Sequence, residues 1–360
     1  MRSFPPFAAL HARPLLAGAI SALCALLIAS CAREAPPADQ ADPGEINIYS
    51  ARHYSSDKLI YDGFTAATGI RVNTIEAKAE VLIEKLKAEG AQSPADVILT
   101  VDAGNLWRAQ EAGLFQPLQS SVLEAAIPAH ERHPEGLWFG FSKRARIIVY
   151  DKSKVNPAQL TDYFALAAPR WKGKICARSS GNIYNLSLMS MMIAHYGADR
   201  AAAWAKGVAA NFARDPTGGD VDQIKAVADG VCELAVVNHY YWVRMARSSD
   251  ASERAAAAKT AIFFPDQAGF GAHVNIAGAG MAAHAPNRDN ARKFLEYLAT
   301  PQVQAIFARE NNEFPVLAGA AFDNPELAAL QGFKEDELPA HVLGENQAQA
   351  QKLFDEAGWR

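Results

Sequence analysis

The sequence predicts an α/β fold for the part of the chain that follows Ile46. Short runs of β-branched and aromatic residues alternate there with segments of helical periodicity, which is typical of α/β architectures. The chain has 360 residues, of which 50% are hydrophobic and 21% are charged, so it can bury a large core. We therefore expect one or two domains in which strands and helices alternate.

The first 30 residues are typical of a lipoprotein signal peptide. Arg2 and Arg13 precede an apolar stretch over residues 15–30, and residues 28–31 read Ile-Ala-Ser-Cys. This ending resembles a bacterial lipobox, in which Cys31 becomes the lipid-modified first residue of the mature chain. The alternative is an uncleaved membrane anchor, although the run is near the short limit for a membrane span. Both interpretations predict that the rest of the chain is exported.

Residues 31–44 are expected to form the lipidated cysteine and a flexible tether. This segment is rich in Pro, Ala and acidic residues and has no apolar periodicity. Folding is therefore expected to begin at Ile46.

The first part of the folded chain contains six expected elements. Apolar alternation indicates strands, Gly at the end of a periodic run indicates a helix terminus, and a long β-type run suits a passage between two lobes. The strands are expected at 46–49, 95–100 and 140–150; the helices are expected at 58–68 closed by Gly69, at a segment that places Val81, Leu82, Ile83 and Leu86 on one face and ends at Gly90, and at 106–111.

The second part of the chain continues the alternation. Pro at the start of two runs is typical of the first turn of a helix, and the methionines near residue 190 are expected to fill a core. The strands are expected at 174–177, 232–237, 262–264 and 273–277; the helices are expected at 157–166, 183–195, 221–229, after Tyr240, at 286–299 and at 301–310.

Two cysteines remain after Cys24 leaves with the leader and Cys31 takes the lipid. In an oxidising compartment Cys176 and Cys232 favour a disulfide. Two buried free cysteines at the ends of core strands are the alternative, because spacing alone does not establish proximity.

Tyrosines follow three of the expected strands. Tyr54 follows the first strand, Tyr184 follows the strand at 174–177, and the adjacent pair Tyr240 and Tyr241 follows the strand at 232–237. Ligands of open α/β sheets bind beyond the carboxyl ends of strands, so these junctions are candidate binding positions. A single tyrosine at a strand end is ordinary, but the joint pattern indicates a shared site.

Clustered tyrosines favour a ferric ion. The pKa of a tyrosine is near 10, so holding one ionised at pH 7 costs roughly 4 kcal/mol, and holding four costs on the order of 16 kcal/mol. Only a strongly acidic cation offsets this cost, and hard anionic oxygens suit Fe(III) better than Fe(II), Cu(I) or zinc. The sequence has neither zinc-like Cys/His spacing nor a calcium loop.

The same stretches resemble a known family, the ferric-iron-binding proteins of bacterial ABC transporters, and in particular its tyrosine-rich branch. The resemblance covers most of the mature chain. It rests on SARHY, on IEKLKAEG with SPADVILTVDAG, and on WFGFSKRARIIVYD, GKICARSSGNIYN, NHYYW and GAHVNIAGAGMAAHAPNRDNARKFLEYL. Ala77 departs from the family, in which Gly is usual, but no expected ligand lies nearby.

The resemblance implies a two-lobe periplasmic solute-binding protein of type II with its cleft between the lobes. Its implied boundaries are 45–145 with 265–318 for the N-terminal lobe, and 146–264 with 319–360 for the C-terminal lobe. It implies that Tyr54, Tyr184, Tyr240 and Tyr241 bind Fe(III), with His53 as a fifth ligand and a synergistic anion such as carbonate in the shell. Asp102 matches a ligand position of other branches and is expected to act only indirectly. The implied protein is a monomeric, membrane-anchored periplasmic lipoprotein that delivers iron to an ABC permease.

Four phenolates around Fe(III) leave a net charge of −1, which requires compensation inside a cleft. Arg52 adjoins the first tyrosine and Arg244 lies one helical turn beyond the tyrosine pair, so they are the candidates to donate hydrogen bonds to phenolate oxygens or an anion. The alternative for each arginine is a salt bridge at the surface or between the lobes. Further candidates are Arg144, Arg146 and Arg178. We expect His239 to face outward.

Other classes of protein fit the sequence less well. It contains no GxSxG, HExxH or P-loop motif, so an enzyme is not expected. The net charge of −4 argues against a nucleic-acid partner. The alternative function is a metal-free solute-binding protein for a small organic ion such as thiamine, a polyamine or a phosphonate.

Overall fold

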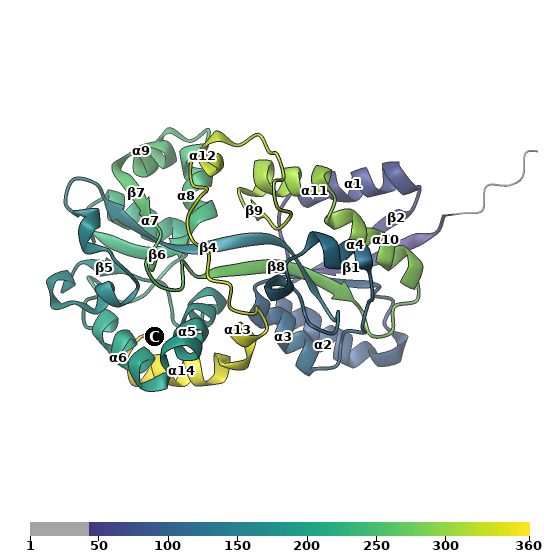
Figure 1. Cartoon of the computed structure of the whole chain (residues 1–360), viewed down its shortest axis with the longest axis horizontal. Coiled ribbons are helices and arrows are strands. Elements are labelled where there is room, and N and C mark those ends of the chain that lie inside the picture. The colour runs from purple at the N-terminus through teal and green to yellow at the C-terminus, as the bar shows by residue number, and fades with distance from the viewer. Residues whose placement is uncertain (1–42) are drawn as a thin grey trace, which may run out of the picture. The chain divides into compact units, whose positions relative to one another are not determined.

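The computed structural model describes residues 43–360 (Figure 1). The signal peptide, Cys31 and all but the last two residues of the expected tether therefore lie outside the described residues. Within the described part of the chain, no helix combines the length and apolar character needed to cross a membrane.

Nine strands form the sheet of residues 43–360, in the order β2, β1, β3, β8, β4, β6, β5, with β7 and β9 also paired to β4. β1 pairs in parallel with β2 and β3, β6 pairs in parallel with β5, and β8 is antiparallel to β3 and β4. The strands are β1 (Glu45–Ser50), β2 (Arg71–Glu76), β3 (Val97–Val101), β4 (Phe139–Asp151), β5 (Ile175–Cys176), β6 (Leu234–Asn238), β7 (Thr260–Phe263), β8 (Val274–Met281) and β9 (Phe314–Pro315).

The α-helices of the described chain lie on both faces of this sheet, above and below it in Figure 1. They are α1 (Asp57–Thr68), α2 (Ala79–Glu89), α3 (Ala103–Glu111), α4 (Ser121–Ala126), α5 (Ile183–Tyr196), α6 (Ala198–Ala209), α7 (Asp220–Ala228), α8 (His239–Ala246), α9 (Ala251–Lys259), α10 (Arg288–Leu298), α11 (Pro301–Ile306), α12 (Pro325–Ala328), α13 (Val342–Glu345) and α14 (Gln347–Glu356).

Strand β4 joins two lobes. Its residues 139–145 pair with β8, whereas residues 146–150 pair with β6 and residues 148–151 pair with β7 (Figure 1). The predicted passage of this long strand between two lobes is therefore confirmed. The residue boundaries predicted for the two lobes remain predictions.

Alternation along β4 separates two hydrophobic cores. Ile147 and Val149 belong to a core that includes Val237 of β6 and Val243 of α8, while Ile148 belongs to the larger core on the other face. Successive side chains of a strand point to opposite faces, so this one strand anchors both layers.

Most of the predicted elements are present, and three expectations need correction. The segment predicted as a helix at 157–166 forms two short 3₁₀ turns, Pro157–Gln159 and Phe164–Ala167. The Asn156 side chain caps the first turn, and the Asp162 side chain accepts a hydrogen bond from the Ala165 backbone N–H in the second, so local bonds hold each turn separately. Val81 is 55% exposed, so only Leu82 and Leu86 of the predicted apolar face are buried. The helix predicted to reach residue 310 gives way at Phe307–Asn311 to a π-helical turn.

A disulfide joins Cys176 of β5 to Cys232. This confirms the prediction from the two remaining cysteines, and it links the segments that lead to Tyr184 and to Tyr240.

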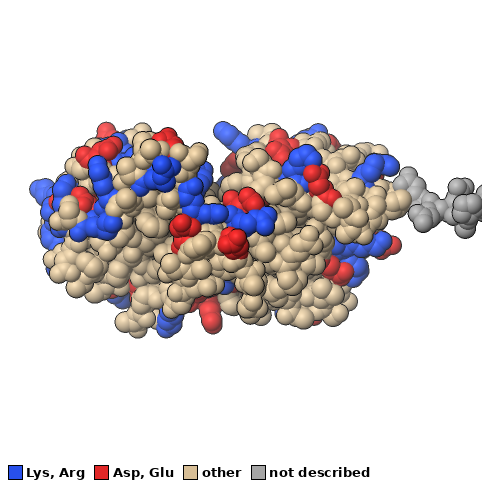
Figure 2. Space-filling view, turned by 90° about the horizontal axis from the view of Figure 1, so that it is seen from above, with Lys and Arg blue, Asp and Glu red and all other residues tan. Residues whose placement is uncertain are grey.

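The face drawn in Figure 2 carries a mixture of charges. Lys and Arg side chains lie there among Asp and Glu side chains rather than in one continuous basic area.

Candidate metal centre

Two of the tyrosines stand at the start of helix α8. Strand β6 ends at Asn238, and the chain turns directly into α8, whose first turn contains Tyr240 and Tyr241. The two rings lie side by side, with their centroids 4.2 Å apart. The abrupt change from strand to helix lets neighbouring side chains point into the same region, which they could not do within a strand.

Tyr184 stands at the start of helix α5. The Asn182 side chain accepts a 3.0 Å hydrogen bond from the Tyr184 backbone N–H and so begins the helix at this point. The Tyr184 hydroxyl lies 3.3 Å from the Tyr240 hydroxyl. Two helix N-termini thus present phenols to one position, and the positive end of a helix dipole favours a negatively charged group.

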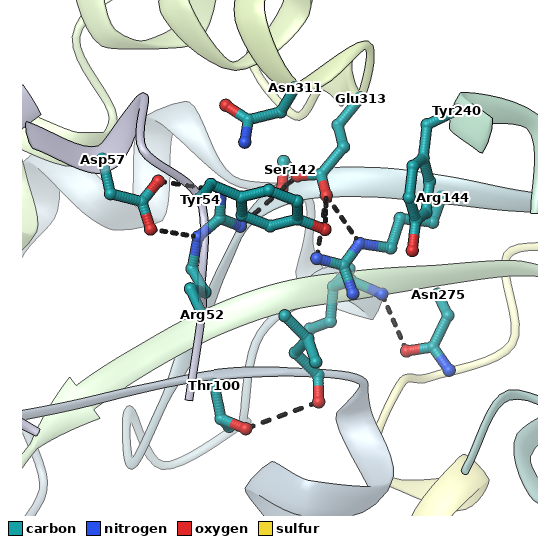
Figure 3. Close-up of polar contacts among 12 residues, drawn as sticks. Arg52, Tyr54, Asp57, Thr100, Ser142, Arg144, Tyr240, Asn275, Asn311 and Glu313 are labelled. Atoms are coloured by element: carbon teal, nitrogen blue, oxygen red, sulfur yellow. Dashed lines mark hydrogen bonds and ion pairs between the residues drawn. The ribbon is translucent and has the colours of Figure 1, made fainter. Parts of the chain in front are cut away.

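Tyr54 reaches the same region from the loop between β1 and α1. Its hydroxyl lies 3.5 Å from Oε1 of Glu313 (Figure 3). The phenol of Tyr54 interacts electrostatically with that of Tyr241, and the phenol of Tyr240 does so with those of Tyr54, Tyr184 and Tyr241. The structure therefore brings all four tyrosines together, although they come from segments far apart in the sequence.

Burial keeps the phenols of Tyr54, Tyr184 and Tyr240 protonated in the metal-free protein. It raises the pKa of Tyr54 to about 12, with Arg144 opposing the rise and Glu313 adding to it. Burial also raises the pKa of Tyr184 and of Tyr240, and the neighbouring tyrosines add to the rise. Ionising this cluster requires a cation of high charge density.

Arg144 lies in the middle of the cluster and is buried. Its Cζ is 5.6 Å from the centroid of the Tyr240 ring, and its Nε donates a 2.9 Å hydrogen bond to Oε1 of Glu313 (Figure 3). Its Nη1 has no hydrogen-bond partner among residues 43–360. Burial alone would lower the pKa of Arg144, but the negative charge of Glu313 and the neighbouring tyrosines raise it by more. The pKa of Arg144 therefore lies above its ordinary value, and the guanidinium stays charged.

Arg52 is also buried, but its guanidinium is held by carboxylates. Its Nε and Nη2 donate to Asp57 at 3.1 and 3.2 Å, and its Nη1 lies 3.4 Å from Oε2 of Glu313. Its Cζ lies 4.8 Å from the centroid of the Tyr54 ring. Arg52 therefore supports Tyr54 through the ring face.

Arg244 has an exposed side chain, and its Cζ lies 5.3 Å from the centroid of the Tyr241 ring. Arg244, like Arg52, is thus adjacent to one of the predicted tyrosine ligands. Its hydrogen bonding to a phenolate or an anion remains a prediction.

His53 lies at the edge of the centre. Its side chain is 54% exposed, and its Nδ1 lies 3.9 Å from Oε2 of Glu76. Metal ligation by His53 also remains a prediction.

His239 does not face outward, which corrects the expectation from sequence. It is fully buried, its Nδ1 accepts a 3.1 Å hydrogen bond from the Ala145 backbone N–H, and its ring stacks on Phe314. Because the chain enters a helix at this residue, His239 and Tyr240 point in different directions.

Arg146, Arg178 and Asp220 form a second group of charges beside the Tyr184 ring. Arg146 and Arg178 both bind Asp220, at 2.8 and 2.9 Å, and their Cζ atoms lie 5.9 and 5.3 Å from the Tyr184 ring centroid. Arg146 also donates to the Asn185 side chain at 2.7 Å. These contacts fix the first turn of α5, and therefore the direction of Tyr184.

Sequence reasoning missed Glu313. This carboxylate is fully buried between the two arginines, accepts a hydrogen bond from the Ser142 hydroxyl, and connects β9 to β4 (Figure 3). It lies more than 250 residues from Arg52 in the sequence, and the local sequence around it carries no motif that would have singled it out.

Comparison with known proteins places the chain among extracellular binding proteins. A family model described as "Bacterial extracellular solute-binding protein" matches residues 92–338. "Iron uptake protein A1" of Synechocystis is 48% identical over 93% of both chains, and the "Fe(3+)-binding periplasmic protein" of Serratia marcescens is 31% identical over 95% of this chain and 97% of its own.

Solved structures agree with this placement. The Trichodesmium protein called IdiA or FutA, in complex with iron and citrate ligands, is 53% identical, has a TM-score of 0.85, and covers 88% of this chain and all of its own. A ferric binding protein from Campylobacter jejuni, 40% identical with a TM-score of 0.83, covers the same share of this chain. The chain thus has the two-lobe, type II fold that its sequence resemblance implied, and it belongs to the bacterial extracellular solute-binding protein family.

Proposed function

We propose that this protein captures Fe(III) between its lobes and delivers it to an ABC permease, with Tyr54, Tyr184, Tyr240 and Tyr241 as the metal ligands. The observation that carries the proposal is the convergence of four phenols around one buried arginine. The relatives from Synechocystis, Serratia marcescens and Trichodesmium, each matched over most of the chain, are iron uptake, ferric-iron-binding or iron-bound proteins, which supports the same cargo.

The charge balance of the centre supports a ferric rather than a ferrous cargo. Three positive charges from the metal and four negative charges from phenolates leave −1. The guanidinium of Arg144, which is also paired with Glu313, offsets part of this excess. A ferrous ion would leave −2 beside the same arginine. It would also repay less of the cost of ionising phenols whose pKa values burial has already raised.

A small carboxylate can complete the metal shell. The Nη1 of Arg144 is buried without a hydrogen-bond partner among residues 43–360, and a guanidinium suits carbonate or citrate oxygens. Citrate accompanies iron in the Trichodesmium structure. We propose that Arg244 closes over this anion and that His53 turns from Glu76 to become a fifth ligand.

Visible absorption tests the proposal. Transfer of charge from phenolate to Fe(III) should give a coloured protein on ferric loading, and the band should weaken strongly in Tyr240→Phe and in Tyr241→Phe. Tyr150→Phe is the matched control, because Tyr150 is a half-buried tyrosine of β4 outside the cluster. A protein that stays colourless after ferric loading, or tyrosine variants with an unchanged band, would exclude tyrosinate coordination.

The alternative cargo, a small organic ion such as thiamine, a polyamine or a phosphonate, has less support. It would leave the phenols of Tyr54, Tyr184 and Tyr240, whose pKa values burial raises, facing one another without a cation to ionise them. A colourless protein that binds such a molecule in the tyrosine cluster would favour this alternative.

We also propose that Cys31 carries a lipid and that residues 31–44 tether the folded body to a membrane on the periplasmic side. We propose further that the boundaries of the two lobes follow the sequence prediction. The protein is then a monomeric transport protein rather than an enzyme. Cys31→Ala should release the protein from the membrane fraction without changing ferric loading.

A further inference from the structure

A second cavity, of about 1050 Å³, lies apart from the tyrosines. It is lined by residues of the segment at 128–131, of β4, of α5, of the segment before β8 and of the segment at 333–339, but by none of the tyrosines of the candidate metal centre. Lys143 lines it, whereas the next residue along β4, Arg144, points to the tyrosines. Because alternate residues of a strand face opposite sides, β4 separates the cavity from the metal centre.

Carboxylates outnumber lysines in the lining of the cavity. Four carboxylates and two lysines line it. Lys143 binds Glu335 at 2.7 and 2.9 Å, and the Nζ of Lys334 donates to the Gly269 carbonyl at 2.6 Å. The fixed cations of the cavity are therefore occupied, and its fixed charge remains negative.

Glu131 is the carboxylate left without sufficient partners. It is 3% exposed, and its Oε2 has no hydrogen-bond partner among residues 43–360. Its Oε1 lies 3.6 Å from both Lys143 Nζ and His130 Nε2, which is beyond hydrogen-bond distance. A buried carboxylate oxygen without a donor is costly, so this position favours a ligand that brings a hydrogen-bond donor and positive charge.

An aromatic surface forms another part of the lining. Phe270 is 47% exposed and stacks on the ring of His195, with the centroids 3.8 Å apart. His195 is itself fixed by a 2.9 Å contact between its Nε2 and Asp336. Phe270 thus offers a supported, accessible ring that can cover a hydrocarbon chain or a cation.

We propose that this cavity binds an organic ammonium ion with an alkyl chain, a primary alkyl amine or linear diamine, whose ammonium group binds Glu131 and whose chain packs on Phe270. A metal ion is a poorer match, because residues 43–360 contain no group of three or more His, Cys, Asp or Glu side chains arranged to hold one. The site goes beyond the proposed iron function and shares no ligand with it.

Ligand binding at Glu131 should release a proton near neutral pH. Burial raises the pKa of Glu131 to about 7, with Lys143 opposing the rise and Glu335 adding to it. His130 is the other titratable group in contact, and burial lowers its pKa. An ammonium ion favours the ionised carboxylate, so the amine should bind more tightly at pH 8 than at pH 6.

Calorimetric titration of the full mature chain with putrescine and with butylamine tests the proposal, using 1,4-butanediol as a neutral match for putrescine and constant ionic strength. We expect saturable binding of putrescine and butylamine and no binding of 1,4-butanediol. Titrations at pH 7 in phosphate and in Tris should give different apparent enthalpies, because the two buffers take up the released proton with different heats.

Two variants locate the ligand. Glu131→Gln should weaken amine binding by at least about tenfold. Phe270→Ala, at an exposed position where folding is not at risk, should weaken it less strongly. Glu84→Gln is the matched control, because Glu84 is an exposed glutamate of α2 away from the cavity.

The outcome is independent of the iron proposal. Amine binding should persist in Tyr240→Phe, and ferric loading should persist in Glu131→Gln. Absence of saturable binding by either amine, or binding that is unchanged in both Glu131→Gln and Phe270→Ala, would overturn the assignment.

Discussion

The hydroxyl of Ser187 donates a 2.6 Å hydrogen bond to Oδ1 of Asp102, and both side chains are buried. Asp102 caps α3 at the end of β3, while Ser187 lies on α5, one turn beyond Tyr184. The bond therefore ties the helix that carries Tyr184 to the part of the sheet that contains β1 and the approach to Tyr54.

Loss of this bond should weaken iron binding. In Ser187→Ala the buried Asp102 loses a donor, so the arrangement that brings Tyr184 toward Tyr54 becomes less favourable. We expect ferric affinity to fall by about tenfold, as measured by competition with a chelator.

Ser190→Ala is the control for this effect. Ser190 is equally buried on the same helix, but its hydroxyl donates within α5 to the Leu186 carbonyl. Equal losses in the two variants would show that α5 itself, rather than the contact with Asp102, controls affinity.

Arg144 should set the pH at which iron is released. Arg144→Met removes the positive charge that lowers the pKa of Tyr54 and of Tyr184, so protons compete better for the phenolates. We expect the midpoint of iron release to move to higher pH, measured as loss of the visible band during acid titration.

The Arg144→Met change also leaves Glu313 with one fewer partner, so the double variant with Glu313→Gln separates the two effects. The double variant should regain folding stability. Because the Glu313 carboxylate raises the pKa of Tyr54 and Arg144 lowers it, the double variant should release iron at a pH between those of Arg144→Met and the unchanged protein. If Arg144→Met alone releases iron at the original pH, the arginine does not act on the phenolates.

Iron affinity should rise with pH. Burial holds the metal-free phenols of Tyr54, Tyr184 and Tyr240 protonated at pH 7, so each ligand loses a proton when the metal binds. These three ligands together should raise the logarithm of the association constant by up to about three for each pH unit. Chelator competition between pH 6 and pH 8, corrected for titration of the chelator, measures this slope.

Removing one phenol tests the proton count. Tyr54→Phe should reduce the slope by about one, since one proton fewer is displaced. Tyr150→Phe should leave it unchanged. A slope that is the same in all three proteins would mean that Tyr54 does not ionise on binding.

Gly69 and Glu313 illustrate which features of the structure can be predicted from the sequence and which cannot. The end of α1 is encoded locally, because Gly69 adopts a left-handed φ of 76° that other residues rarely take. The tyrosines could be found in the same way, since each follows a strand. Glu313 meets Arg52 and Arg144 only through the tertiary fold, so no local pattern indicates it.

Local competition explains the helix that sequence reasoning predicted wrongly at 157–166. Asn156 and Asp162 each satisfy backbone N–H groups with their own side chains, and these local bonds replace the continuous ladder of an α-helix. Apolar periodicity alone does not report this competition.

Loss of the disulfide should lower the free energy of unfolding but leave the positions of the metal ligands unchanged. Cys176 and Cys232 lie 56 residues apart and join β5, which precedes Tyr184, to the segment just before β6, which precedes Tyr240. Replacing both by Ala frees a long loop in the unfolded chain and should lower the free energy of unfolding by about 2 to 5 kcal/mol, measured by urea denaturation of the metal-free protein. Because β5 and β6 also pair through backbone hydrogen bonds, the folded variant should keep its ferric absorption band. The unchanged protein in a strong reductant should match the variant, and the variant should not respond to the reductant. Loss of the band in a variant that remains folded would instead mean that the covalent link itself holds Tyr184 and Tyr240 in position.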